Sequence, residues 1–147
     1  MAQNVIVPVI DLTSAAEGTT TPQNLQTAIA FGSQTAFAAR SSSVVVANTT
    51  GFYRIFGTAN ILSNASGVIE VRFDMSDGLS TKVVWAIKTP AVTAHPFISD
   101  YDFVVFLAAG DSITAVSNDS DGLLNGSSRQ IADVNGNLVN PSGFTPQ

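Results

Sequence analysis

The sequence lacks cysteine altogether, and charged residues make up only 12% of its 147 residues. The absence of cysteine excludes disulfide scaffolds, thiol catalysis and thiolate metal sites. Soluble domains carry a charged fraction of about 25%, so the surface of this chain must consist largely of small polar and apolar side chains. Because little charge has to be desolvated when such a surface is covered, the composition favours tight assembly.

Basic residues are also scarce. The six Lys and Arg residues are scattered and give a formal net charge of −5. This distribution disfavours a surface that follows nucleic-acid phosphates or binds an anionic membrane. No apolar run approaches the roughly 18 residues of a membrane span, and the first residues lack the basic and apolar regions of a signal peptide. We therefore predict no nucleic-acid or membrane partner for a protein made in the cytoplasm.

Reactive side chains are few and isolated. The single histidine, His95, has no ligand or catalytic partner near it in the sequence, and no phosphate loop, nucleophile elbow or zinc-protease motif occurs. Asp119 and Asp121, followed by Gly122, resemble a fragment of a calcium loop, but a solvated turn is the favoured interpretation because no glutamate follows Glu70. The sequence predicts no enzyme, no metal and no cofactor, and leaves a cation at these two aspartates undecided.

Residues 51–116 carry the clearest strand patterns. Apolar side chains alternate with polar ones from Val68 to Met75, which is typical of a half-buried strand. From Phe52 to Ile61 the period is also two, but both faces carry aromatics near the start, so we expect one face to meet the core and the other a neighbour. The patterns predict strands at 35–39, 44–47, 52–61, 68–75, 81–88, 97–99, 101–108 and 112–117, and a further hairpin at 131–139. Long loops at 89–96 and 118–129 suit crossovers between sheets. We predict an all-β antiparallel sandwich of the jelly-roll type with about eight strands.

The chain divides into three parts on composition. Residues 1–34 form a predicted N-terminal arm, 35–140 the jelly-roll domain and 141–147 a tail. Pro8 suits an edge strand or an arm that lies on another surface, and after Pro22 the arm either forms a short helix or stays extended. The apolar arm residues are Val5, Ile6, Val7, Val9, Ile10 and Leu12.

Two motifs carry a family resemblance. Gly51-Phe52-Tyr53-Arg54-Ile55, followed by the segment 103–113, which reads Phe-Val-Val-Phe-Leu-Ala-Ala-Gly-Asp-Ser-Ile, resembles the jelly-roll module of the tumour-necrosis-factor and complement-globular-head superfamily. The match covers roughly residues 35–117 and implies a homotrimer built around a threefold axis. The matching interface positions are Tyr53, Ile55, Phe103, Val105 and Ile113. The alternative is that all five belong to an ordinary monomer core.

The arm, the low charge and the jelly-roll pattern together also resemble phage head decoration (cement) proteins. That resemblance implies a virion structural protein on the capsid surface, whose partners are its own copies and the major capsid protein of the shell. The arm would bind the shell by strand addition. The alternative function is the receptor- or glycan-binding head of a phage fibre, with binding loops at 89–102 and 118–129.

Overall fold

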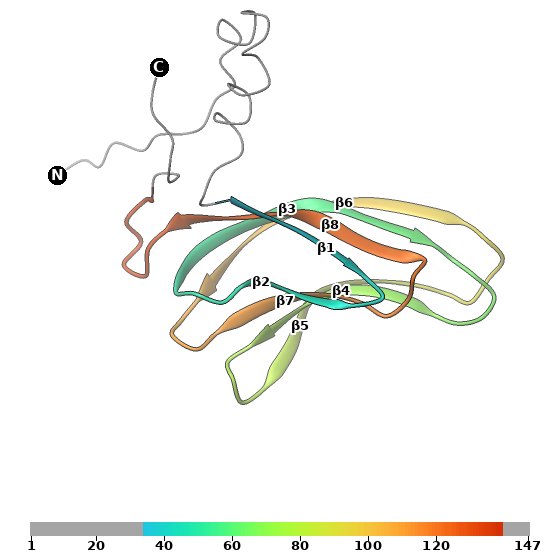
Figure 1. The fold of residues 1–147 in the computed structure, drawn as a ribbon, viewed down its shortest axis with the longest axis horizontal. Coiled ribbons are helices and arrows are strands. Elements are labelled where there is room, and N and C mark those ends of the chain that lie inside the picture. The colour runs from blue at the N-terminus through green and yellow to red at the C-terminus, as the bar shows by residue number, and fades with distance from the viewer. Residues whose placement is uncertain (1–33, 140–147) are drawn as a thin grey trace, which may run out of the picture.

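The computed structural model describes residues 34–139, which form eight strands and no helix. Figure 1 shows the strands stacked as two layers. The predicted arm and tail lie almost wholly outside the described residues. The strands are β1 (Gln34–Arg40), β2 (Ser43–Ala47), β3 (Gly51–Leu62), β4 (Ile69–Ser76), β5 (Thr81–Thr89), β6 (Pro96–Leu107), β7 (Ser112–Ser117) and β8 (Gly122–Ala132).

The strand order confirms the predicted all-β antiparallel sandwich. Sheet I has the order β1-β8-β3-β6 and sheet II the order β2-β7-β4-β5, with every pair antiparallel. Only the hairpin between β4 and β5 stays within one sheet, and every other connection crosses to the opposite layer. This order is that of a jelly roll, in which two Greek keys wrap around one core.

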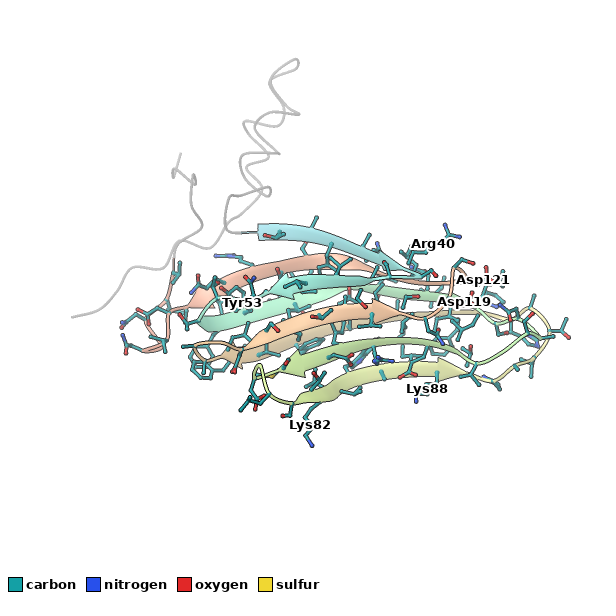
Figure 2. All side chains as sticks on the ribbon, turned by 60° about the horizontal axis from the view of Figure 1, so that its bottom comes forward. Arg40, Tyr53, Lys82, Lys88, Asp119 and Asp121 are labelled. Carbon is teal, nitrogen blue, oxygen red and sulfur yellow. The ribbon has the colours of Figure 1, made fainter. Side chains whose placement is uncertain are left out.

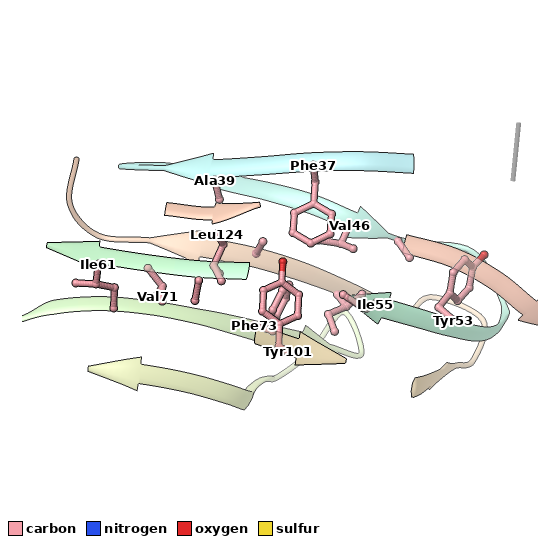
Figure 3. Packing of buried hydrophobic residues seen from close by; sticks show 14 of the residues in the cluster. Phe37, Ala39, Val46, Tyr53, Ile55, Ile61, Val71, Phe73, Tyr101 and Leu124 are labelled. Atoms are coloured by element: carbon pink, nitrogen blue, oxygen red, sulfur yellow. The ribbon is translucent and has the colours of Figure 1, made fainter. Parts of the chain in front are cut away.

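The core lies between the sheets, where the predicted alternation places its apolar side chains. Ile55 on β3 and Val71 on β4 are fully buried, as is Phe73 at the centre (Figure 3). The Phe73 ring contacts four aromatic rings at centroid distances of 5.0–5.9 Å. Edge-to-face aromatic pairs of this kind add about 0.5–1.5 kcal/mol each beyond the burial of their area. The other rings of this cluster are those of Phe37, Trp85, Tyr101 and Phe103.

Tyr101 shows why two glycines stand in the middle of sheet I. Gly57 and Gly126 are paired across β3 and β8, and a Cβ at either would lie 2.6 Å from the Tyr101 hydroxyl. With no side chains there, the buried Tyr101 lies across both strands, and its hydroxyl donates to the Asn125 carbonyl at 2.9 Å. Burial raises the pKa of Tyr101 well above its ordinary value.

Two predicted boundaries were wrong. The segments 97–99 and 101–108 form one strand, β6, which pairs with β3 along its whole length. The segment 118–129 is not a long loop, because the turn ends before Gly122 and β8 then runs between β1 and β3. Backbone hydrogen bonding on both sides stabilises this strand despite its small polar residues, a case in which tertiary structure overrides local propensity.

The predicted C-terminal hairpin is present only as a tight turn. Gly136 has a φ of 81°, and its amide donates to the Asp133 carbonyl at 3.0 Å. Only Ala132 and Leu138 form a bridge across it. The Asn135-Gly136 signal therefore located the turn correctly, but of the residues predicted as its strands only Ile131 and Ala132 lie in a strand, at the end of β8.

Candidate subunit interface

The five residues that the family resemblance implies as interface residues all point between the sheets. Ile55 and Ile113 have no exposed surface, and Tyr53 is 7% exposed. Phe103 and Val105 are half-buried and pack against the core. A neighbouring subunit cannot touch Ile55 or Ile113 unless the core rearranges, so the structure places these residues in the monomer core, as the alternative interpretation expected.

The outer side of sheet I carries the apolar residues that a subunit interface needs. We define the aromatic face as the outward side chains of Phe52, Phe56, Val104 and Phe106 on β3 and β6. The rings of Phe52 and Phe106 lie 4.8 Å apart, and Val104 and Phe106 are 54% and 40% exposed. Contiguous apolar groups on the surface of a domain mark interaction sites. The sequence predicts that both faces of β6 are covered. Within the described residues, only its inner face is covered, by the core.

An ion pair rigidifies the same face. Arg54 donates to both carboxylate oxygens of Asp102, at 2.9 and 2.6 Å, and its guanidinium lies over the Phe56 ring at 5.1 Å. The hydrogen bond raises the pKa of Arg54 and lowers the pKa of Asp102. Such an exposed pair contributes little to stability, and it holds the guanidinium over the Phe56 ring.

A second candidate surface lies along β5, at the edge of sheet II. We define the β5 edge as Val83, Val84, Trp85 and Ile87. Val83 and Val84 are 56% and 45% exposed, and β5 pairs with β4 alone among the described strands. Because β1 packs near β2, the strand orders place β5 and β6 at the same side of the sandwich. An open strand edge of this kind offers unpaired backbone groups to another chain.

Two lysines flank this edge. Lys82 and Lys88 project from β5 away from the sandwich (Figure 2). Lysines on an edge strand hinder uncontrolled pairing with the edge of another sheet, because they must be desolvated. The β5 edge is therefore better suited to packing against a side-chain face than to extending a sheet.

The outer face of sheet II has the opposite character. Arg72 forms ion pairs with Asp74 at 2.9 Å and with Glu70 at 3.6 Å, and Lys88 reaches Glu70 at 3.3 Å. The hydrogen bond that Arg72 donates to the Asp74 carboxylate raises the pKa of Arg72. Covering this network would cost the desolvation of four charges. The two faces of the sandwich thus differ sharply in how readily they can be buried.

The remaining candidate residues occupy turns. His95 is exposed in the crossover between β5 and β6, and its backbone binds Ser63. The Asp119 carboxylate accepts from the Asp121 amide at 2.9 Å, which is a turn contact, and Figure 2 places both aspartates in the turn between β7 and β8. Within residues 34–139, no group of three or more His, Cys, Asp or Glu side chains is arranged to hold a metal ion.

Two solved structures resemble the chain over nearly its whole length. The first is a crystal structure of a pentameric capsid protein from metagenomic phage sequences, which is 37% identical, with a TM-score of 0.64, and covers 96% of this chain and 86% of its own. The second, a pentameric capsid protein from metagenomic phage sequences solved by iodide phasing, is also 37% identical, with a TM-score of 0.64 and coverages of 95% and 87%. The chain belongs to this phage capsid protein family. No family model matches the sequence, and no curated protein matches it.

Membership of the capsid family settles the class of function but leaves its details open. It supports a virion structural role and self-association, in agreement with the coarse prediction from sequence. The tumour-necrosis-factor resemblance, the trimer and the decoration role stay predictions. None of the described residues forms a helix long and apolar enough to cross a membrane.

Proposed function

We propose that this protein is a structural subunit of a phage capsid and that it assembles through the aromatic face into a closed ring of five. The observation that carries the proposal is the cluster of exposed apolar side chains on β3 and β6, which nothing in residues 34–139 covers. Five copies are preferred to the three expected from sequence because the 37% identical relatives are described as pentameric.

A ring requires two different surfaces on each subunit. In a closed ring of more than two copies, every contact is heterologous, so a patch on one copy meets a different patch on the next. The described domain offers two such surfaces, the aromatic face of sheet I and the β5 edge. We infer that the aromatic face of one subunit packs against the β5 edge of the next. Val83 and Val84 would then meet Val104 and Phe106, and Lys82 and Lys88 would stay at the rim in water.

The N-terminal segment is proposed to attach the ring to the shell. Gln34 pairs with Arg129 near the end of β8, so residues 1–33 and 140–147 both join the sandwich at one end. The apolar run 5–12 lies outside the described residues, and its proposed partner is the major capsid protein, bound by strand addition. A decoration or cement role follows from such an attachment.

The fibre alternative loses part of its support. A receptor- or glycan-binding head would use loops at 89–102 and 118–129, but 96–107 and 122–132 are strands. Only short turns remain for recognition at that end of the sandwich. No contact of the described residues favours the alternative over a capsid role.

The solution mass of the purified protein tests the ring. We expect five times the chain mass of 15.3 kDa by native mass spectrometry and by light scattering. Three times the chain mass would support the trimer expected from sequence, and a monomer at micromolar concentration would overturn the assembly proposal.

Binding to phage heads tests the attachment separately. A variant that lacks residues 1–33 should form the same ring but should no longer sediment with heads. The full-length protein is the matched control. If the truncated ring binds heads at full occupancy, the N-terminal segment is not the attachment device.

A further inference from the structure

Arg129 carries a buried nitrogen that has no hydrogen-bond partner among the described residues. It lies on β8 in sheet I, directly opposite Arg54 on β3. The unpaired nitrogen is its Nε atom. Leaving a buried donor unpaired destabilises the fold, and the penalty is larger when the group is charged.

The electrostatic surroundings add to this cost. Burial lowers the pKa of Arg129, and the positive charge of Arg54 lowers it further. A cation that is partly desolvated and faces a second cation destabilises the isolated subunit. The positive charge of Arg129 therefore lowers the stability of the subunit unless a carboxylate binds it in the assembled protein.

The acids on the same face are already engaged. Asp102 accepts both of its hydrogen bonds from Arg54, at 2.9 and 2.6 Å. Asp100, two residues along β6, accepts from the Thr58 hydroxyl at 3.2 Å. Neither carboxylate is bonded to Arg129, so the compensating charge has to come from beyond these residues.

We propose that Arg129 binds a carboxylate of a neighbouring copy of this chain when the subunits assemble. The position supports this partner, because Arg129 lies one strand from the aromatic face and on the same side of sheet I. Charge supports it as well, since each copy carries eleven acidic residues against six basic ones. The delocalised guanidinium can take up a carboxylate through its outer nitrogens and so offset the charge at Nε. The inference rests on the proposed ring.

The test compares Arg129→Met with Arg129→Lys and wild-type protein. Met keeps the length of the side chain but removes the charge, so the dilute, dissociated subunit should unfold at the same or a higher urea concentration than wild type. The concentration at which rings dissociate should rise about tenfold or more, because the pair between subunits is lost. Lys keeps the charge without the planar fork and should fall between the two.

Arg40→Met is the matched control on the same sheet. The Arg40 Nε donates to the Ser120 carbonyl at 2.6 Å, at the end of the sandwich away from Tyr53 (Figure 2). This change should leave ring dissociation unaltered. Added salt should weaken the wild-type ring more than the Arg129→Met ring, since screening acts on a pair that only the wild type has.

Three outcomes would overturn the inference. Rings of Arg129→Met that dissociate at the wild-type concentration would show that no carboxylate binds there. A loss of subunit stability equal to the loss of assembly would show that the partner lies within the same chain. A wild-type protein that stays monomeric would overturn both this inference and the proposed ring. Either of the other two outcomes would overturn the inference about Arg129 alone.

Discussion

Replacing Phe106 by serine is expected to weaken the ring strongly while leaving the subunit folded. A phenylalanine side chain offers about 200 Å², and Phe106 is 40% exposed, so roughly 80 Å² is left for a neighbour to cover. At about 25 cal/mol per Å², covering it contributes about 2 kcal/mol to each contact. Removing one subunit from a ring breaks two contacts, which makes the loss about 4 kcal/mol per subunit released.

Dilution followed by native mass spectrometry measures this loss. A change of about 2 kcal/mol in one contact corresponds to about a 30-fold change in its dissociation constant. The Phe106 ring also contacts Phe52 at 4.8 Å, so urea unfolding of the variant must show that the domain still folds cooperatively. Fluorescence of Trp85, which packs on Phe73 in the core, reports that unfolding.

Val45→Ser is the matched control for Phe106→Ser. Val45 is 56% exposed on β2, at the side of the sandwich away from β5 and β6. It removes comparable apolar area from a surface that the proposed ring does not use. If the two variants dissociate alike, or if Phe106→Ser rings persist at the wild-type concentration, the aromatic face is not the subunit contact.

Three further changes probe the sandwich itself. Gly126→Ala should lower the free energy of unfolding by about 2–3 kcal/mol, measured as a shift of the urea midpoint. The new Cβ would lie 2.6 Å from the Tyr101 hydroxyl and would overlap the β3 backbone. Tyr101→Phe should cost about 1 kcal/mol in the same assay through the lost bond to the Asn125 carbonyl, and an unchanged midpoint would contradict the role of that bond. Asp102→Asn should lower the free energy of unfolding above about pH 4, because the ion pair with Arg54 is lost. Arg54 lowers the pKa of Asp102, so the difference in unfolding free energy between variant and wild type should disappear as the pH falls through that pKa.

The inner face of β4 could be predicted because its alternation has one apolar set. Ile69, Val71 and Phe73 alternate with charged residues, so only one face can be buried. The segment Tyr101–Leu107 gives no such choice. Phe103 and Val105 form one apolar set, and Val104 and Phe106 form the other. The period of two separates the two sets but does not say which one meets the core, and the structure places Phe103 and Val105 against the core.

Strand β8 could not be predicted because its residue types suit contacts with residues that are distant in the sequence. Gly126 is small because Tyr101 lies across it. Ser128 is polar but buried, and its hydroxyl donates to the Val46 carbonyl at 3.0 Å. Neither reason is visible in the local pattern, which indicates a loop. The sequence did contain a usable signal in the apolar residues Leu124 and Ile131, but the run of Asn, Gly and Ser between them obscured it.

The contrast between the two faces of the sandwich also fixes how a subunit should sit in an assembly. The carboxylates of Glu70 and Asp74 are already largely buried by the arginine and lysine that pair with them, at 16% and 14% side-chain exposure. Covering them further would remove their remaining water without adding a partner, which costs several kcal/mol per ion. The outer face of sheet I carries apolar rings and a cation that lacks a partner in the described chain. A subunit that turns the outer face of sheet I and the β5 edge toward its neighbours, and the outer face of sheet II toward solvent, keeps Glu70 and Asp74 hydrated and brings Arg129 within reach of a neighbour's carboxylate. The opposite orientation does neither, so protection from hydrogen exchange on assembly should fall on β3, β5, β6 and β8 and spare the outer positions of β4.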